Sequence, residues 1–414
     1  DVFQETLKDF DLASAEKITG VPQSQIAEAA LIYATNSPAS ILYGMGITQH
    51  AHGTDNVSAI ANLAMLTGNI GKPASGVNPL RGQNNVQGAC DMGALPNVYC
   101  GYQAVTTPAI KEKFEAAWDS SLPPTAGLTI TEIFDAVHQG KIKALYLVGE
   151  NPMLSEPDAN HVREALSRLD FFVAQDIFLS ESAELAHVVL PGTTFAEKDG
   201  TFTNTERRVQ LVRKVIEPLG DSRTDWQITC QIAERMGGKG FHFEHPSQIM
   251  DEIARLTPSY GGISFERLEV EGLQWPCPTR EHLGTPILHT KTFTRGKGLF
   301  LSLEYKPPME LPDNDYPLVL TTGRNIFQYH TGTMSRKVKG LNIFKGEERA
   351  EINPEDATKL GIVDNDMIKV VSRRGEVTTK ARVTKASLVG VVSMTFHFAE
   401  SPTNVLTNPA VDLI

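Results

Sequence analysis

The residue types best suited to chemistry gather in one irregular stretch, residues 76–93, where glycines and side-chain amides surround a single arginine. The guanidinium of Arg81 forms a planar fork that suits a small carboxylate or a phosphate. Glycines let the backbone approach a ligand closely, and side-chain amides offer paired donors and acceptors. The amides are those of Gln83, Asn84, Asn85 and Gln87. The stretch therefore predicts a ligand-lining loop, with a glycine-rich connector between lobes as the equal alternative.

Loops of the same composition recur along the chain, most of them directly after a predicted strand. They follow Tyr43, Val148 and Gln175 and recur at 203–204, at 321–324 and at His397. Together they suit a large polar ligand with several phosphates that is held by more than one domain. Asp176 and Asp225 are the carboxylates suited to the donor edge of a base such as guanine, although helix N-capping explains both positions as well.

Most standard catalytic and binding signatures are absent from the sequence. There is no G-x-G-x-x-G after a strand, and residues 68–73 are not a P-loop because Pro73 replaces the required Ser or Thr. His50 and His52 share a loop but lack a third ligand nearby, which favours a surface or hydrogen-bonded role over metal binding. The four cysteines form no C-x2-C pair and indicate reduced thiols.

Length and composition describe an ordinary soluble globular protein of two to four domains, with 414 residues, 41% of them hydrophobic and 21% charged. The net charge of −11 argues against a nucleic-acid partner, and no basic run points to a membrane surface. No apolar run approaches the roughly 18 residues of a membrane span. The sequence starts at Asp1 without a signal peptide, so we expect a cytoplasmic protein whose chain begins partway through a longer product.

Hydrophobic periodicity places these loops on an α/β framework. Apolar strands at 40–43, 144–148, 171–175 and 187–190 alternate with helices, which predicts a parallel, doubly wound sheet. The predicted helices lie within 12–36 with a break at 20–22, from 54 or 55 to 67, and at 108–118, 130–139, 157–168 and 225–236.

From residue 239 onward, the pattern of the sequence changes. Residues 239–315 are rich in proline and glycine and predict a partly ordered connection between lobes. From Tyr316 onward, short strands and one helix at 354–360 predict a small β-barrel. The strands are expected at 317–320, 350–353, 367–371, 377–383 and 391–396.

Residues 81–93, RGQNNVQGACDMG, closely resemble the corresponding loop of formate dehydrogenase catalytic (alpha) subunits. These subunits belong to the molybdopterin oxidoreductase family, which includes dimethyl sulfoxide reductase. Six other segments are similar to the wider family and follow its order along nearly the whole chain. They are residues 43–49, 66–71, 149–152, 175–178, 201–208 and 322–332.

The resemblance implies an α/β fold with doubly wound, mostly parallel sheets, present incompletely, and a carboxyl-terminal six-stranded β-barrel of the double-psi type. It also implies four regions. Residues 1–82 would be the tail of one α/β cofactor-binding domain, and 83–195 part of a second, dinucleotide-binding one. Residues 196–300 would form a mixed connecting region, and 301–414 the molybdopterin-dinucleotide-binding barrel.

The cofactor implied by the resemblance is a molybdenum or tungsten ion held by two molybdopterin guanine dinucleotides. Arg81 would sit beside the metal and orient the carboxylate of formate. The residues implied to line the dinucleotides are Met45, Gln49, Gly82, Gln83, Gly149, Glu150, Asn151, Asp176, Ser180, Asn204 and Asp225. Those implied to close over them from the barrel are Gly323, Arg324, His330, Thr331, His397 and Asn404.

Family members open with a four-cysteine iron–sulfur domain and then a selenocysteine or cysteine metal ligand beside a histidine, and none of these is in this sequence. The chain therefore resembles the carboxyl-terminal part of such a subunit and is expected to be inactive alone, with no metal ligand of its own. The complete subunit would oxidise formate to carbon dioxide reversibly and pass electrons through a 4Fe-4S cluster to a partner subunit or carrier. Another molybdopterin enzyme such as a nitrate reductase, or a non-catalytic subunit like that of respiratory complex I, remains an alternative.

Overall fold

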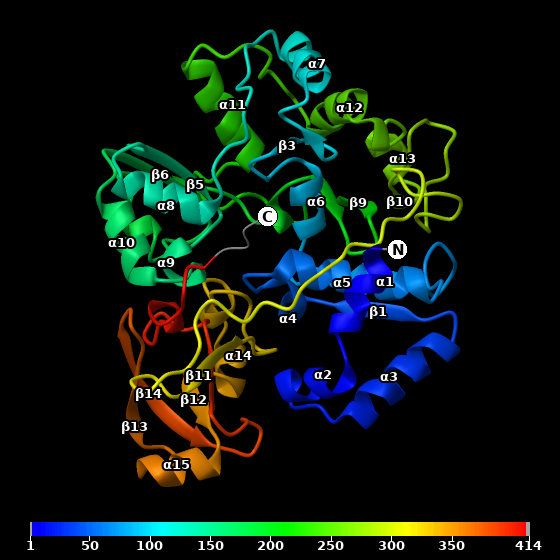
Figure 1. Cartoon of the computed structure of the whole chain (residues 1–414). Helices are drawn as coiled ribbons and strands as arrows, with labels where there is room; N and C mark the ends of the chain where they lie inside the picture. The colour runs from blue at the N-terminus through cyan, green and yellow to red at the C-terminus, as the bar shows by residue number, and fades with distance from the viewer. Residues whose placement is uncertain (1, 411–414) are drawn as a thin grey trace.

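The computed structural model describes residues 2–410 and shows five β-sheets, with helices packed between and around them. Figure 1 shows these sheets as separate bodies around the middle of the molecule, with the carboxyl-terminal sheet on the opposite side from helices α7 and α12.

The first body ends in the Arg81 loop. Gly20, with a φ of 71°, ends helix α2, and Pro22 precedes helix α3, which confirms the predicted break. Strands β1 and β2 are parallel, so the loops that follow Tyr43 and Pro79 leave the same edge side by side. The elements are α1 Val2–Thr6, η1 Leu7–Asp9, α2 Leu12–Thr19, α3 Gln23–Thr35, β1 Ser40–Tyr43, α4 Met45–Thr48, α5 Gly53–Leu66 and β2 Gly76–Pro79.

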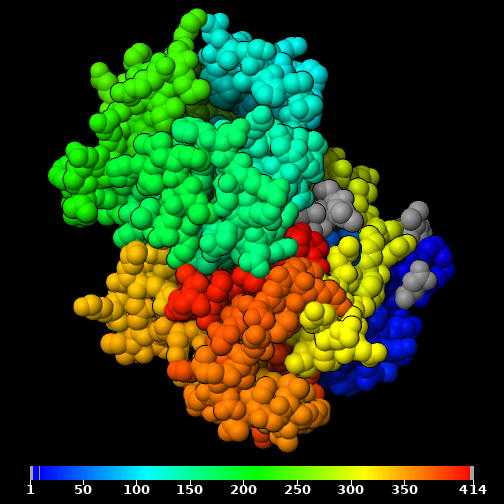
Figure 2. All heavy atoms as spheres, turned by 90° about the vertical axis from the view of Figure 1, so that its left-hand side faces the viewer, coloured from blue at the N-terminus to red at the C-terminus, as the bar shows by residue number. Residues whose placement is uncertain are grey.

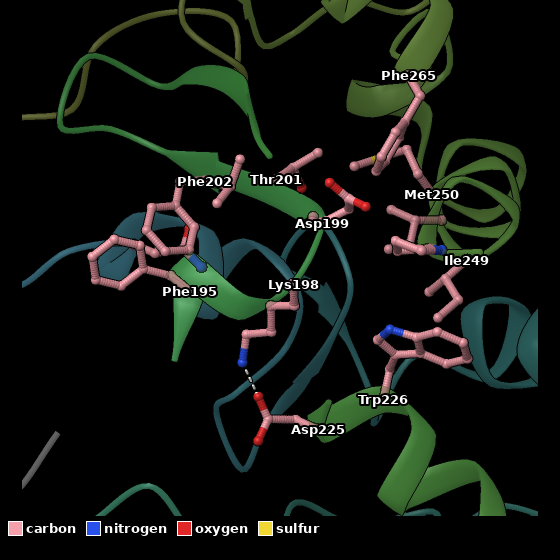
Figure 3. Close-up of a pocket in the computed structure, with 15 residues that line it drawn as sticks. Phe195, Lys198, Asp199, Thr201, Phe202, Asp225, Trp226, Ile249, Met250 and Phe265 are labelled. Atoms are coloured by element: carbon pink, nitrogen blue, oxygen red, sulfur yellow. Dashed lines mark hydrogen bonds and ion pairs between the residues drawn. The ribbon is translucent and has the colours of Figure 1, made fainter. Parts of the chain in front are cut away.

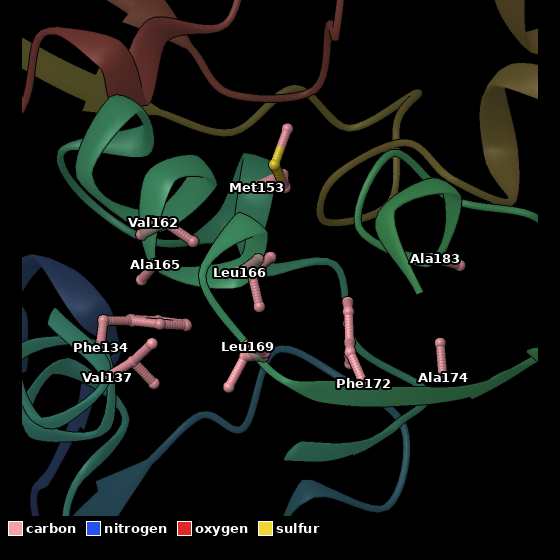
Figure 4. Packing of buried hydrophobic residues seen from close by; sticks show 10 residues of the cluster. All are labelled: Phe134, Val137, Met153, Val162, Ala165, Leu166, Leu169, Phe172, Ala174 and Ala183. Atoms are coloured by element: carbon pink, nitrogen blue, oxygen red, sulfur yellow. The ribbon is translucent and has the colours of Figure 1, made fainter. Parts of the chain in front are cut away.

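The second body is built on a parallel sheet of order β5-β6-β7. Helices α8 and α10 pack on one face of this sheet, where Phe134, Leu166 and Phe172 form a buried core (Figure 4). Its elements are α8 Ile130–His138, β5 Ala144–Val148, α9 Pro152–Ser155, α10 Ala159–Ser167, β6 Phe171–Asp176, η2 Ala183–Leu185 and β7 Val188–Pro191. The segment before α8 lies against helix α12 (Figure 1) and contains α6 Val86–Asp91, β3 Val98–Tyr99, β4 Gln103–Ala104 and α7 Pro108–Trp118.

The predicted strands are present, but strand β5 is buried on one face only. Tyr146 and Val148 on β5 are 41% and 45% exposed, and Phe171 on β6 is 49% exposed. Side chains alternate across a strand, and the α8–α10 core covers only one face of the sheet. The other face is apolar and partly open in the part of the chain that the structure describes.

The third body contains the ordered part of residues 239–315, which were predicted to be a partly ordered connection: the regular elements of this range end at Gln274. Helix α12 begins at Pro246, the favoured residue for a first helical position, and buries Met250 and Leu256. Strand β10 extends the antiparallel β8–β9 pair. The elements are η3 Phe195–Glu197, β8 Gly200–Thr203, β9 Arg208–Val212, α11 Asp225–Arg235, α12 Pro246–Leu256, η4 Pro258–Tyr260, α13 Phe265–Leu268 and β10 Leu273–Gln274.

The carboxyl-terminal body is a mixed sheet of order β11-β15-β12-β14-β13. It has five strands within residues 2–410, so the six-stranded, closed barrel is not reproduced there. The α15 helix and four of the five strands lie at the predicted positions, while β11 begins two residues later than predicted. The elements are β11 Val319–Gly323, η5 Ser335–Lys337, α14 Lys339–Phe344, β12 Arg349–Ile352, α15 Pro354–Leu360, β13 Met367–Val371, β14 Glu376–Val383, β15 Val391–Thr395 and η6 Thr403–Val405.

The carboxyl-terminal body docks directly on the second one. Figure 2 shows the red residues near the carboxyl terminus lying between the orange sheet and the green α/β unit. Asn404 makes this contact, because its Nδ2 donates to the carbonyls of Leu154 at 2.7 Å and Ser155 at 3.1 Å. The two bodies are therefore held together by specific hydrogen bonds. The boundaries of the four predicted domains stay a prediction.

Candidate functional site

The Arg81 loop leaves strand β2 and turns into helix α6. Asn85, at the N-cap, adopts a φ of 58°, and its Oδ1 accepts a hydrogen bond from the Thr203 backbone N–H at 2.9 Å. Nε of Arg81 donates to Oε1 of Gln87 at 3.1 Å. Within residues 2–410 the two Nη groups of Arg81 have no hydrogen-bond partner, and the residue is exposed. Its fork is thus available to a ligand.

Two contacts bring the carboxyl-terminal body onto this loop. The Asn84 backbone N–H donates to the Tyr329 hydroxyl at 3.1 Å. Nη2 of Arg324, which follows β11, lies 3.3 Å from the Sδ of Met45 at the start of α4. Residues 245 and 279 positions apart are therefore in contact here. The cofactor-binding roles that the resemblance implied for Met45 and Arg324 stay predictions.

His330 and His397 form a neutral pair beside Arg324. The Asn325 backbone N–H donates to Nε2 of His397 at 2.8 Å, which leaves the proton on Nδ1, and this Nδ1 donates to the His330 carbonyl. The Arg324 guanidinium lies 4.8 Å above the Phe396 ring. Burial first, and then the charge of Arg324, lower the pKa of His330 to about 4, and burial also lowers the pKa of His397.

The depressed pKa of His330 predicts a loss of stability in acid. The unfolded chain takes up a proton on this residue below about pH 6.5, while the folded chain does so only near pH 4. The free energy of unfolding should therefore fall as the pH drops through this window, by at most about 1.4 kcal/mol per pH unit from this group. Urea unfolding of His330→Gln, whose side chain carries no titrating proton, should show a shallower dependence on pH. Identical slopes would contradict the assignment.

A second group of predicted residues lies at the carboxyl edge of the β5-β6-β7 sheet. Gly149, Glu150 and Asn151 follow β5, and Asp176 ends β6; because the strands are parallel, these residues share one edge. Burial and the neighbouring Asp176 charge raise the pKa of Glu150. Burial and the Asp225 charge raise the pKa of Asp176. This edge of the sheet therefore holds carboxyl groups whose ionised forms are unfavourable unless a hydrogen-bond donor binds them.

Asn151 connects this edge to the carboxyl-terminal body. Its Oδ1 accepts from Ser182 N–H at 3.2 Å and Oγ at 2.7 Å. Its Nδ2 donates to Glu181 Oε2 at 2.7 Å and to Thr333 Oγ1 at 3.3 Å. Oγ of Thr333 also lies 2.9 Å from that of the buried Thr331. The Asn151 side chain is therefore an internal bridge that fixes the loops of the site.

Asp225 opens helix α11 but does not cap it, since Thr224 is the N-cap residue. Its carboxylate pairs with Lys198 and accepts from Nε2 of Gln175 at 2.7 Å. The pair lies at one side of an open pocket of about 310 Å³, whose wall carries Phe195, Phe202 and Trp226 (Figure 3). Asp176, likewise, is no helix cap, and its Oδ1 accepts from the Ile177 backbone N–H at 2.7 Å.

The remaining predicted residues are placed as follows. Ser180 is buried and its Oγ accepts from the Ala183 N–H at 3.3 Å, while Asn204 binds the backbone of its own turn. The exposed Gln49 ends α4, and Asn404 faces α9. Gly82 and Gly149 have no atom within 4 Å of where a Cβ would stand, and Gly323 has one at 4.0 Å. Gln83 is half-buried and supplies a carbonyl to the Val86 N–H at 3.4 Å. Their roles toward a ligand stay predictions.

A hydrogen-bonded group around a buried carboxylate was not predicted from the sequence. Asp91 is fully buried and is contacted by Gln87, Tyr102, Tyr260 and Trp275. Only the amide of Gln87 carried a signal in the sequence. Gln87 shares helix α6 with Asp91, but the other three partners come from distant segments, and so no local pattern predicts that they meet. Lys198 beside Asp225 was missed for the same reason.

Metal-binding clusters and membrane-spanning helices are not found in the described part of the chain. Within residues 2–410, no group of three or more His, Cys, Asp or Glu side chains lies close enough together to hold a metal ion. All four cysteines are free, and Nε2 of His50 donates to the Gly46 carbonyl at 2.8 Å. Across the same residues, every helix is too short or too polar to cross a membrane.

The site residues fit a pterin dinucleotide in two respects. The three glycines of the loops leave open space beside Arg81, β5 and β11. Thr193 follows β7, and its carbonyl accepts from Nζ of Lys198, the partner of Asp225, at 3.2 Å. Thr193 is buried, and its Oγ1 has no hydrogen-bond partner among the described residues. A carboxylate near Lys198 can accept hydrogen bonds from the donor edge of a base, and the guanidinium of Arg324 can donate hydrogen bonds to a phosphate. The donor set thus matches a large anionic ligand.

Two protein-family models match this chain. Residues 10–235 match the family model described as molybdopterin oxidoreductase, and residues 318–414 match that of the molydopterin dinucleotide binding domain. Because the first match covers more than half of the chain, the protein belongs to the molybdopterin oxidoreductase family.

Individual relatives agree with this membership. The chain is 53% identical to the F420-dependent formate dehydrogenase subunit alpha of Methanocaldococcus jannaschii over 99% of its length and 61% of the relative. It is 40% identical to formate dehydrogenase H of Escherichia coli, over 96% of this chain and 56% of that one. The fold is similar to that of acetylene hydratase from Pelobacter acetylenicus, with a TM-score of 0.71, 19% identity and coverage of 99% and 62%. The chain thus spans about three fifths of these proteins.

Proposed function

We propose that this chain is part of the catalytic subunit of a molybdenum- or tungsten-dependent formate dehydrogenase. The observation that carries the proposal is Arg81, whose Nη fork is unoccupied by protein partners within residues 2–410 while its Nε is fixed by Gln87. Such a fork binds a carboxylate through two parallel hydrogen bonds. Relatives named formate dehydrogenase match almost the whole chain and so support the substrate class.

The reaction converts formate to carbon dioxide, one proton and two electrons. When bound, the pterin dinucleotide cofactor supplies the two-electron acceptor. Arg81 binds both formate oxygens, which directs the carbon–hydrogen bond away from the guanidinium. Its positive charge also holds the carboxylate in place while the carbon loses its hydrogen and two electrons. Since the guanidinium stays protonated, Arg81 positions the substrate and moves no proton.

The dinucleotides would be held by both α/β bodies and by the carboxyl-terminal sheet. We assign base recognition to Asp176 and Asp225, and phosphate contacts to Arg324 and the open glycine loops. Thr193 supplies a buried hydroxyl that lacks a partner within the described residues. The family match at residues 318–414 supports this role for the carboxyl-terminal body. The same proposal includes a six-stranded closed barrel in the complete protein.

The complete enzyme would pass its electrons through a 4Fe-4S cluster to a partner subunit or carrier in the cytoplasm and could run in both directions. The metal ligand, selenocysteine or cysteine, would also lie outside this chain. The length of the relatives supports this proposal, since the chain covers only about three fifths of them.

Formate-dependent reduction of a viologen dye by the full-length protein, together with elemental analysis, tests the proposal. We expect formate turnover and one Mo or W per subunit. Turnover with nitrate but not with formate would identify another molybdopterin reductase instead. Absence of both metals from a fully folded preparation would identify a non-catalytic subunit like that of respiratory complex I.

A further inference from the structure

The buried carboxylate of Asp91 lies directly behind Arg81. Asp91 ends helix α6, and none of its surface is exposed. Its Oδ1 accepts from Nε2 of Gln87 at 2.8 Å and from the Tyr102 hydroxyl at 2.9 Å. A buried carboxylate is tolerated only when hydrogen bonds replace its lost hydration, and this one is supplied on both oxygens.

The other oxygen is held from the third body. Oδ2 of Asp91 accepts from the Tyr260 hydroxyl at 2.5 Å and from Nε1 of Trp275 at 2.7 Å. Burial and the charge of Asp91 raise the pKa of the hydroxyls of Tyr102 and Tyr260, so that both remain protonated donors. Since the indole nitrogen can only donate, Oδ2 is required to be an acceptor.

These donors determine which way the Gln87 amide faces. The amide has one acceptor end and one donor end, which differ by a flip of the group. Because Nε2 donates to Asp91 and lies 2.9 Å from the Tyr102 hydroxyl, Oε1 must face the other way. There it accepts from Nε of Arg81 at 3.1 Å. A reversed amide would place two donors against each other at Arg81.

We propose that Asp91 is a positioning residue for formate, because its carboxylate fixes the Gln87 amide and thereby aims the Arg81 fork. Arg207 supports the same arrangement: its guanidinium lies 5.4 Å above the Trp275 ring, and the Asp91 charge opposes the effect of burial, which lowers the pKa of Arg207. This inference rests on the proposed function, since it concerns the residue that binds the substrate there.

The geometry predicts a specific defect for Asp91→Asn in the full-length enzyme. Trp275 can only donate, so the new amide must turn its oxygen to Trp275 and its NH₂ to Gln87. Gln87 then flips and presents its own NH₂ to Arg81. We expect kcat/KM for formate to fall by about 10- to 100-fold, with a raised KM, as for the loss of supporting hydrogen bonds in other sites.

A second substitution at position 87 should restore the formate kinetics that Asp91→Asn loses. In the double variant Gln87→Glu/Asp91→Asn the amide and the carboxylate exchange places, and the total charge is unchanged. The carboxylate at position 87 accepts from Asn at 91 and from Nε of Arg81 without regard to its orientation. Gln87→Glu alone sets two carboxylates side by side and should be impaired. The double variant should therefore recover most of the KM and kcat/KM that Asp91→Asn loses.

Steady-state kinetics, melting temperatures and crystal structures of the wild type, both single variants and the double variant test the inference. Asp356→Asn is the matched control, since Asp356 is also buried but lies in α15, where it accepts from the Gly390 N–H at 2.6 Å. It should lower the melting temperature and leave the KM unchanged. Crystal structures should show the side chain of Arg81 displaced in Asp91→Asn and restored in the double variant.

The outcomes separate the two proposals. A wild type without formate turnover overturns the proposed function, whatever the variants do. An active wild type with an unchanged KM in Asp91→Asn, or a double variant no better than that single one, overturns the role of Asp91. If Asp91→Asn does not fold, Gln87→Met removes the acceptor while keeping the volume. That variant should then show the raised KM, and a wild-type KM in it would equally overturn the role.

Discussion

Replacement of Arg81 by alanine in the full-length protein is expected to lower kcat/KM for formate by about 10²- to 10³-fold. The variant loses both hydrogen bonds of the guanidinium fork and the charge that holds the carboxylate. The fold should be unaffected, because Arg81 is exposed and its side chain makes a single hydrogen bond within residues 2–410, to Gln87. Metal and pterin contents should therefore equal those of the wild type.

Two further variants make this expectation specific. Arg81→Lys keeps the charge but not the planar fork, so its KM should lie between those of the wild type and the alanine variant. Arg168→Ala serves as the control, since Arg168 pairs with Glu164 on the surface of the second body. Wild-type kinetics in Arg81→Ala, with formate as the substrate, would remove Arg81 from the site.

Replacement of Gly88 by alanine is the second large effect, and it concerns stability. A Cβ at this buried position would stand 2.0 Å from Oδ1 of Asn85. That oxygen accepts the Thr203 N–H, so Asn85 cannot move without breaking the link to strand β8. Overpacking of this kind costs about 1–3 kcal/mol, which thermal or urea unfolding detects. Loss of this link should also displace the Arg81 loop and lower formate turnover.

Gly82→Ala on the same loop is the matched comparison. A Cβ there meets no described atom within 4 Å, and so its melting temperature without cofactor should equal that of the wild type. The resemblance to known enzymes implied that Gly82 lines the dinucleotides. The variant should consequently carry less pterin than the wild type, as measured after acid release. Equal destabilisation by both substitutions would show that the difference in packing is not the cause.

The fold could be predicted wherever the signal is local. Strand β5 and helix α7 lie at the predicted residues because apolar spacing and flanking breakers define them without reference to other parts of the chain. Helix α12 was missed, although Met250, Ile253 and Leu256 have helical spacing. Proline- and glycine-rich neighbours on both sides obscured it. Exposure of one sheet face is not encoded in strand periodicity at all.

The site could be predicted only as separate loops. Composition identified Arg81 and the amides after it, and the resemblance to known enzymes connected them with Arg324 and His330. The Asp91 network could not be predicted, because Tyr260 and Trp275 lie 169 and 184 residues from it along the chain. A single aspartate, tyrosine or tryptophan gives no indication of which distant partner it meets.

The bonds between Asn84 and Tyr329, and between Asn151 and Thr333, join segments 245 and 182 residues apart. Contacts of such sequence separation require large loops to close and form slowly during folding. Fragments that have folded only their local helices and strands cannot yet present both walls of the site. Cofactor affinity is consequently a property of the finished fold, and a nascent or partly unfolded chain would be left without it.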